Sequence, residues 1–141
     1  DNMKVYLISN DLLSCKQCGF MKGRSTILQL LNALDDWTEA VDARLPVDVI
    51  YTDFQKAFDS VPHGGLLQKL TSIGIKGKLH AWIQSFLLNR KQRVKIKGCT
   101  SEWMDVLSGV PQGSVLGPLL FIIYINDISR YIRLPLLFIC R

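Results

Sequence analysis

Apolar positions near the start of the chain recur at helical spacing and then give way to a continuous apolar run. Between residues 26 and 41 they fall three or four positions apart, at Ile27, Leu30, Leu31, Leu34, Trp37 and Val41. This period predicts a helix whose apolar stripe lies in the core, capped by Ser25 or Thr26. The β-branched run over 47–53 predicts a buried strand. Residues 3–14 predict a short helix or an irregular lead-in.

The middle of the chain predicts two helices and a strand pair. Apolar spacing predicts a helix over 66–73 that ends at Gly74, and a second over about 78–88, with Leu79, Trp82, Ile83, Phe86 and Leu87 facing inward. Residues 91–97 alternate cations with apolar residues, which predicts a half-buried strand. Residues 102–107 are its predicted antiparallel partner, after a turn.

The last third contains a glycine- and proline-rich loop followed by a long apolar run. Residues 108–118 hold three glycines and two prolines, which suits either an ordinary strand-to-helix turn or close approach to a ligand. Residues 115–128 predict a buried helix, and 134–139 a second buried strand. Together these elements predict an α+β fold in which helices pack on a sheet.

Composition bounds these predictions. A chain of 141 residues that is 48% hydrophobic has room for one domain with a packed core, which excludes a disordered protein. A net charge of +5 leans mildly towards polyanionic partners. No apolar stretch approaches the roughly 20 residues of a membrane span, and no signal peptide is visible, so we expect an intracellular protein of the cytoplasm or nucleus. Because the chain lacks a leading Met, we interpret it as a fragment.

Two features have metal-binding potential. Cys15 and Cys18 have the spacing of half a zinc site, but no second Cys/His pair answers them, which favours free thiols. Asp53 follows the predicted strand at 47–53. It either caps the next turn or binds Mg²⁺, since hard cations prefer oxygen ligands.

Three motifs taken together identify a family. They are QCGFMKGRST over 17–26, DFQKAFD over 53–59 and GVPQGS over 109–114. In this order they closely resemble the reverse transcriptases of non-LTR (LINE-type) retrotransposons, and the resemblance spans roughly residues 3 to 138. It implies a partial right-hand polymerase fold, with a fingers-like segment over 1–46 and a palm-like segment over 47–141.

The resemblance implies RNA-directed DNA polymerase activity. In intact members of the family two Mg²⁺ ions (or Mn²⁺), about 3.5–4 Å apart, support nucleotidyl transfer. Asp53 resembles the first catalytic and metal-binding carboxylate, and Phe54 would add a backbone carbonyl ligand. The implied partners are an RNA template, a DNA primer and dNTPs, with no membrane.

The resemblance also implies contacts to the incoming dNTP. The backbone of Gln55, Lys56 and Ala57 would donate to the triphosphate. Phe58 resembles the steric gate that excludes a 2′-hydroxyl, although packing in the core is the alternative. Gln112, next to Gly113, resembles the residue that contacts the sugar. Asp59 is expected to have a structural role as a turn or helix cap.

Basic residues are the candidate contacts to the polynucleotide. Arg24 and Lys22 either meet phosphates or remain solvated. Arg90, Lys91, Arg93, Lys95 and Lys97 form the densest basic cluster. This cluster suits the phosphates of a template–primer duplex, or it is a solvated edge that discourages aggregation. A non-catalytic nucleic-acid-binding remnant that uses Arg90–Lys97 is therefore an alternative function, and a relic without function is a third.

The sequence departs from the family in one respect. The family's Ala-Asp-Asp is missing, and no acidic pair follows Asp127. One carboxylate neutralises too little charge to hold two Mg²⁺ ions, so we expect this chain alone not to polymerise. An unpaired strand at 47–53 would also invite aggregation.

Overall fold

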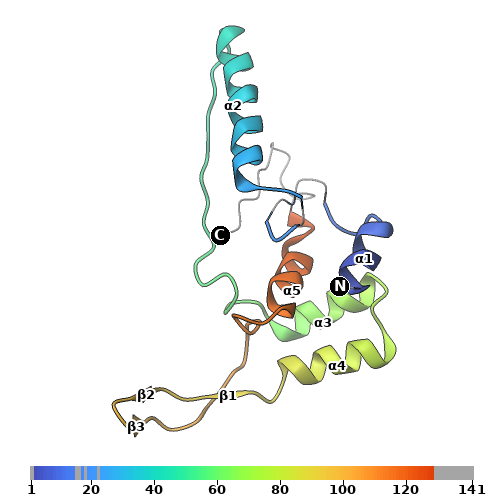
Figure 1. The fold of residues 1–141 in the computed structure, drawn as a ribbon, viewed down its shortest axis with the longest axis vertical. Helices are drawn as coiled ribbons and strands as arrows, with labels where there is room; N and C mark the ends of the chain where they lie inside the picture. Colours follow the sequence, from blue (N-terminus) through green and yellow to red (C-terminus); the bar gives the residue numbers. More distant parts are fainter. Residues whose placement is uncertain (1, 15–16, 18, 22, 129–141) are drawn as a thin grey trace. The chain divides into compact units, whose positions relative to one another are not determined.

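The structure is a computed structural model that describes residues 2–14, 17, 19–21 and 23–128 (Figure 1). It divides into two compact units. The described part of the first comprises residues up to Phe54 together with 126–128, and the second is Gln55–Ile125. The predicted strand at 134–139 lies outside the described residues.

The first unit contains two helices, α1 (Asn2–Ser9) and α2 (Thr26–Asp42). Ser25 caps α2, because its side chain accepts a hydrogen bond from the Leu28 amide at 3.1 Å. Asn126 ties the described residues of this unit together, since its Nδ2 donates to the Leu12 carbonyl at 2.8 Å and its Oδ1 accepts from the Ser14 amide at 2.7 Å. The predicted helix and its cap at Ser25 are confirmed.

The predicted burial of the α2 stripe is wrong. Ile27 and Val41 are 68% and 63% exposed, and Leu30, Leu31 and Leu34 are exposed as well. The buried residues of α2 are Gln29 and Ala33. Helical periodicity predicts that a face is apolar, but the face becomes core only where another element covers it.

The predicted buried strand at 47–53 is also wrong. Residues 45–54 have no regular secondary structure, and Ile50 and Tyr51 are 77% and 83% exposed. A strand exists only where a neighbour completes its hydrogen-bond ladder. In the part of the chain that the structure describes, residues 46–53 have no strand pairing.

The second unit is built around three helices, α3 (His63–Ser72), α4 (Gly77–Leu87) and α5 (Leu116–Ile125). Helix α5 is apolar on all sides and is therefore buried, with Leu120, Phe121, Ile122, Ile123 and Ile125 in the core. Helix α3 packs on both α4 and α5, as Figure 1 shows. All three predicted helices are confirmed.

Helix ends follow the sequence signals. Gly74, with φ of +89°, ends α3, and Asn89, with φ of +56°, follows α4. Leu66, Leu70, Ile83 and Leu87 are fully buried between the helices. The predicted inward positions of Leu79 and Trp82 are wrong, because both residues are exposed.

A hairpin connects α4 to the loop before α5. Its strands are β1 (Lys91–Gln92), β2 (Lys95–Ile96), β3 (Cys99–Thr100) and β4 (Met104–Asp105). β1 pairs with β4 and β2 with β3, both antiparallel. Lys97 and Gly98 form its two-residue turn with φ of +47° and +88°, the geometry that matches the twist of a hairpin.

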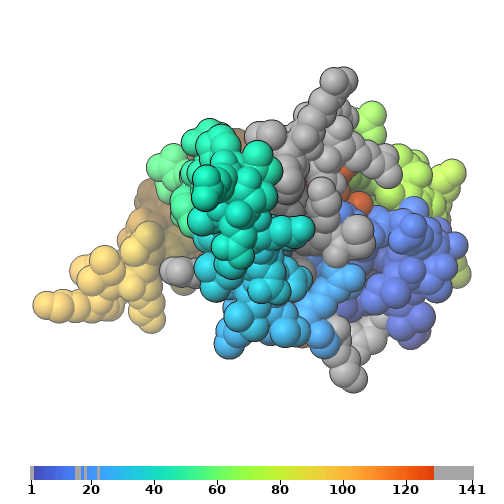
Figure 2. Space-filling model, turned by 90° about the horizontal axis from the view of Figure 1, so that it is seen from above, coloured from blue at the N-terminus to red at the C-terminus, as the bar shows by residue number. Residues whose placement is uncertain are grey.

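The predicted antiparallel pairing is thus confirmed, but the predicted half-burial is wrong. All residues from 91 to 105 are exposed, because the hairpin extends away from the helices of its own unit (Figures 1 and 2). Among the described residues, the sheets are these two short ribbons, and no helix packs on either of them. The predicted mixture of helices and antiparallel strands is confirmed. The predicted packing of helices on a sheet is not seen among the described residues. No helix in the described ranges is long and apolar enough to cross a membrane.

Candidate functional site

Two of the motifs singled out in the sequence lie against each other in the second unit. The glutamine loop, defined here as residues 108–114, packs on residues 58–61, and three of its hydrogen bonds go to backbone carbonyls there. The Val110 amide donates to the Phe58 carbonyl at 2.9 Å, and the Gly109 amide donates to the Val61 carbonyl at 2.7 Å. The Ser108 hydroxyl donates to the Asp59 carbonyl at 2.7 Å. These bonds fix the loop to the segment that follows Asp53 in the sequence.

Close backbone approach explains the glycine at position 109. Gly109 has φ of +90°, and a Cβ there would lie 2.8 Å from the Asp59 Cα and 2.9 Å from the Asp59 carbonyl oxygen. Real Cβ atoms do not come so close to backbone, and L residues rarely adopt this φ. Only glycine allows the loop to pack at this distance.

Two side chains form hydrogen bonds with the Gly109 carbonyl oxygen. His63 Nε2, at the start of α3, lies 2.9 Å from the Gly109 oxygen, and Arg90 Nη2 donates to the same oxygen at 2.9 Å. Arg90 Nε donates to the Leu87 carbonyl at 3.0 Å. Arg90 therefore bridges the end of α4 to the loop. Its predicted role in nucleic-acid binding stays a prediction.

A side-chain contact also joins the two motifs. Gln112 Nε2 donates to Asp59 Oδ1 at 3.2 Å, and both residues are exposed. Asp59 thus accepts from the loop through both its carboxylate and its carbonyl. The amide of Gln112 is oriented on the surface of the unit rather than turned into its core.

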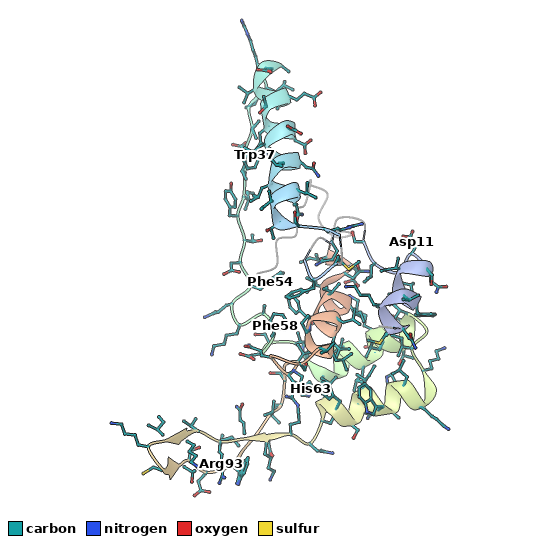
Figure 3. The ribbon with its side chains drawn as sticks, viewed as in Figure 1. Asp11, Trp37, Phe54, Phe58, His63 and Arg93 are labelled. Atoms are coloured by element: carbon teal, nitrogen blue, oxygen red, sulfur yellow. The ribbon has the colours of Figure 1, made fainter. Side chains whose placement is uncertain are left out.

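Phe58 lies between the loop and α5. Its ring stacks on Phe121 with centroids 4.8 Å apart and planes at 29°, and the residue is half-buried (Figure 3). Phe58 therefore has the packing contact that the sequence offered as an alternative, and the steric-gate role stays a prediction.

The neighbouring candidate residues lie in a turn. Lys56 has φ of +50°, and the Ser60 amide donates to the Lys56 carbonyl at 2.9 Å. Gln55, Lys56 and Gly113 are exposed, and Ala57 is half-buried. The exposed residues among them lie at the surface of the unit.

Asp53 and Phe54 belong to the other unit, and both are exposed. The family resemblance implies that Asp53 and the glutamine loop share one nucleotide-binding cleft, and this stays a prediction. The Asp53 carboxylate and the Phe54 carbonyl are oxygen donors of the kind that Mg²⁺ prefers. However, no group of three potential metal ligands occurs in the described ranges, and one carboxylate is too little charge for two ions. On their own, these two donors do not fit a two-magnesium site.

The candidate nucleic-acid contacts lie in two places. In the first unit, Arg24 Nη1 donates to the Gln17 carbonyl at 2.7 Å, and Lys22 lies outside the described residues, as do Cys15 and Cys18. On the hairpin, Lys91 pairs with Asp105 at 3.7 Å, and the Arg93 guanidinium lies 4.5 Å from the centre of the Trp103 ring. Lys95 and Lys97 are exposed.

Sequence reasoning did not find the contacts of His63 and Arg90 to Gly109. His63 occurs in a turn-like stretch without other histidines nearby, and Arg90 is one of several neighbouring cations. Neither has a local signal, because the contact joins segments far apart in the chain.

Comparison with known proteins agrees with the motifs. Residues 3–140 match the family described as reverse transcriptase (RNA-dependent DNA polymerase). The chain is 35% identical over 134 residues to the RNA-directed DNA polymerase from mobile element jockey of Drosophila melanogaster, which covers 89% of this chain and 14% of that protein. The jockey polymerase of Drosophila funebris is 38% identical over 114 residues, covering 81% of this chain and 12% of that protein.

A third relative is the probable RNA-directed DNA polymerase from transposon BS of Drosophila melanogaster. It is 32% identical over 117 residues, covering 83% of this chain and 13% of that protein. The chain thus spans 12–14% of the length of these relatives. It belongs to the reverse transcriptase family and is related to the polymerases of non-LTR retrotransposons.

Proposed function

We propose that this chain is a segment of an RNA-directed DNA polymerase that helps to bind the incoming deoxynucleotide and contributes the carboxylate of Asp53 to catalysis. The observation that carries the proposal is the Gln112–Asp59 hydrogen bond at 3.2 Å, which joins the two motifs through their side chains. We propose further that residues 1–46 are fingers-like and 47–141 palm-like parts of a right-hand polymerase fold. RNA template, DNA primer and dNTPs are the proposed partners.

The reaction proposed for the intact polymerase is nucleotidyl transfer. The primer 3′-oxygen forms a bond to the α-phosphorus of a dNTP, the bond from that phosphorus to the α–β bridging oxygen breaks, and pyrophosphate leaves. A Mg²⁺ pair that supports such a reaction needs carboxylates in addition to Asp53. Apart from Asp53, the residues of this chain are proposed to bind and select the nucleotide.

Binding and selection of the nucleotide are assigned to the turn at 55–58 and to the glutamine loop. Backbone amides of the turn would donate to the triphosphate. The amide of Gln112 offers both donors and an acceptor to the sugar, and Gly113 keeps the neighbouring backbone accessible. Phe58, held by its stacking on Phe121, would exclude a ribose by its ring edge.

A chimera tests the proposal. The matching 134 residues of the Drosophila melanogaster jockey polymerase are replaced by this chain, and primer extension on a homopolymer RNA template is measured. We expect template-dependent incorporation that falls at least about 100-fold with Asp53→Ala and has a KM for dNTP about tenfold higher with Gln112→Ala. A folded chimera whose activity is the same with and without Asp53 would contradict the proposal.

The isolated chain needs a separate assay. With Mg²⁺, a primer and a homopolymer template, we expect no incorporation above an Asp53→Ala control, because one carboxylate does not hold two ions. Incorporation above that control would show that the chain polymerises by itself.

A second candidate function is nucleic-acid binding without catalysis. The exposure of all residues from 91 to 105 favours it, because Arg93, Lys95 and Lys97 are then open to solvent. Exposed cations that meet phosphates make affinity fall with salt concentration. Substitution of Arg93 and Lys95 by Gln should flatten the plot of log affinity against log salt concentration.

A further inference from the structure

The hairpin presents its cations on one face. Side chains alternate between the two faces of a strand, so Lys91, Arg93 and Lys95 share a face. Cross-strand partners also share a face, which adds Asp105 opposite Lys91 and Thr100 opposite Lys95. Asp105 offsets the charge of Lys91 through their ion pair, whereas no ion pair of Arg93 or Lys95 is recorded in the described part of the chain.

A bulge adds an aromatic ring to this cationic face. Between the paired positions 92/104 and 95/100, two residues on one strand (93–94) face three on the other (101–103). Such an extra residue re-aims the side chains beside it. Here Ser101 fixes the bulge, because its amide donates to the Val94 carbonyl at 2.9 Å and its hydroxyl accepts from the Val94 amide at 2.9 Å.

The ring brought into place is Trp103. Arg93 covers one side of it, with the guanidinium carbon 4.5 Å from the ring centre, yet Trp103 remains 55% exposed. A buried indole would be explained by the core, but this one lies on the hairpin, on which none of the described helices of its own unit packs (Figure 3). The guanidinium lies over the ring, and more than half of the Trp103 surface stays open to solvent.

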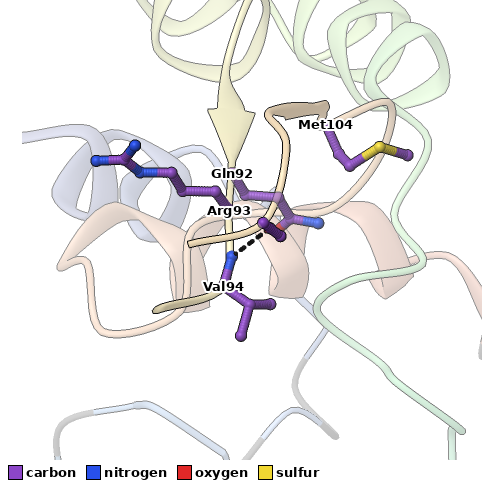
Figure 4. A pocket seen from close by; sticks show the side chains of 5 residues that line it. Gln92, Arg93, Val94 and Met104 are labelled. Carbon is purple, nitrogen blue, oxygen red and sulfur yellow. Dashed lines mark hydrogen bonds between the residues drawn. The ribbon is translucent and has the colours of Figure 1, made fainter. Parts of the chain in front are cut away.

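The opposite face of the hairpin has different chemistry. Alternation along the strand places Gln92 and Val94 there, and Met104 is the cross-strand partner of Gln92. With Arg93 and Ser101, these three residues line a pocket beside the bulge (Figure 4). Val94 and Met104 are apolar and carry no charge that would attract phosphate. The cationic face that holds Trp103 is therefore the one suited to a polyanion.

We propose that Trp103 is a stacking platform for an unpaired base of a single-stranded nucleic acid whose phosphates contact Arg93, Lys95 and Lys97. The proposal rests on the proposed function in one respect, that the partner is a polynucleotide. Cations beside an exposed aromatic ring are the combination by which proteins bind single strands, since every base has a face that stacks. The bases of a duplex are already stacked on one another. A duplex would therefore contact the cations through its phosphates without stacking a base on the indole.

Fluorescence anisotropy of a labelled oligoriboadenylate, titrated with the whole chain, tests the platform. We expect Trp103→Ala to weaken binding about tenfold without changing the salt dependence, because stacking is lost and every phosphate contact stays. Trp103→Phe should retain most of the affinity. Trp82→Ala is the matched control: Trp82 is 56% exposed on α4, where it stacks on Phe86, and its loss should leave binding unchanged.

A second measurement keeps Trp103 intact. In a chain with Trp37→Phe and Trp82→Phe, Trp103 is the single indole, and the oligonucleotide should quench its emission with the dissociation constant that anisotropy gives. The proposal would be overturned if the oligonucleotide did not quench Trp103, or if the Trp103→Ala and Trp82→Ala chains bound it equally well. It would also be overturned if the chain bound a duplex more tightly than the single strand and Trp103→Ala left the affinity for the duplex unchanged.

The outcome is separable from that of the proposed function. Primer extension by the chimera depends on Asp53, which lies outside the hairpin. An active chimera without base stacking at Trp103 would refute only the platform, and stacking in a chain whose chimera is inactive would refute only the polymerase assignment.

Discussion

Gly109 is the residue on which the packing of the glutamine loop depends most directly. Gly109→Ala would combine a φ of +90° with a Cβ 2.8 Å from the Asp59 Cα. We expect it to lower the free energy of unfolding of the chain by roughly 2–4 kcal/mol, because backbone strain and a backbone clash add. Urea denaturation followed by circular dichroism measures this loss.

Gly113 provides the matched control. It has φ of +78°, but a Cβ there would meet no atom within 4 Å. Gly113→Ala should therefore cost only the strain of the left-handed conformation, about 1 kcal/mol. Equal losses at the two positions would show that the contact with Asp59 contributes nothing.

Arg90 is expected to position the loop. Arg90→Ala removes one of the two donors to the Gly109 carbonyl and the donor to the Leu87 carbonyl. We expect the Gly109 and Val110 amides to exchange their hydrogens at least about tenfold faster. The reason is that the loop loses its hydrogen bond to Arg90 and separates more often from residues 58–61. Amides in the middle of α5 should be unaffected.

Arg93→Ala is the control for charge. It removes one cation from the same hairpin, but Arg93 contacts Trp103 rather than the loop. If its effect on the Val110 amide equalled that of Arg90→Ala, loss of charge rather than loss of the Gly109 contact would be the cause. Hydrogen exchange followed by mass spectrometry or NMR distinguishes these cases.

At the scale of single residues, the sequence named candidate residues but not most of their contacts. The family resemblance pointed to Gln112, which the structure joins to Asp59 by a hydrogen bond at 3.2 Å, and the role of Asp59 as a turn or helix cap stays a prediction. The donors to Gly109 had no signal, because a contact between residues 63, 90 and 109 depends on how the helices between them pack.

Among the elements, the start of α5 links the glutamine loop to the core. The Ser114 hydroxyl accepts from the Gly117 amide at 2.9 Å and donates to the Pro111 carbonyl at 2.7 Å. We expect Ser114→Ala to cost about 1 kcal/mol of stability through loss of this cap. Ser114→Thr should retain most of it, because it keeps the hydroxyl. Thermal denaturation of the two variants provides the comparison, and equal melting temperatures would contradict the cap.

The elements show what periodicity predicts and what it does not. Helices α2, α3 and α4 follow from apolar spacing, α5 from a continuous apolar run, and the hairpin from alternation, while Gly74 follows α3 and Asn89 follows α4. Burial does not follow in the same way: α5 is buried because it is apolar on all sides, whereas the stripe of α2 and Trp82 on α4 are exposed. Periodicity is a property of one segment, and burial needs a second segment to cover it.

Considered as a whole molecule, the chain exposes an apolar segment with high strand propensity. Val49, Ile50 and Tyr51 are exposed, and residues 46–53 have no strand pairing in the described ranges. The prediction of a buried strand failed here for the same reason, since composition gives the propensity and only a neighbouring strand gives the ladder. Such a segment presents backbone groups to which a second chain can add.

We therefore expect concentration-dependent self-association through residues 47–53, measured by light scattering. Ile50→Lys should slow it several-fold, because charge on an unpaired apolar segment opposes edge-to-edge pairing. Ile96→Lys is the matched control. It adds the same charge at a residue that is 65% exposed, but its strand already pairs within the hairpin. If both substitutions slow association equally, net charge governs it. If only Ile50→Lys does, residues 47–53 are the segment that pairs with another chain.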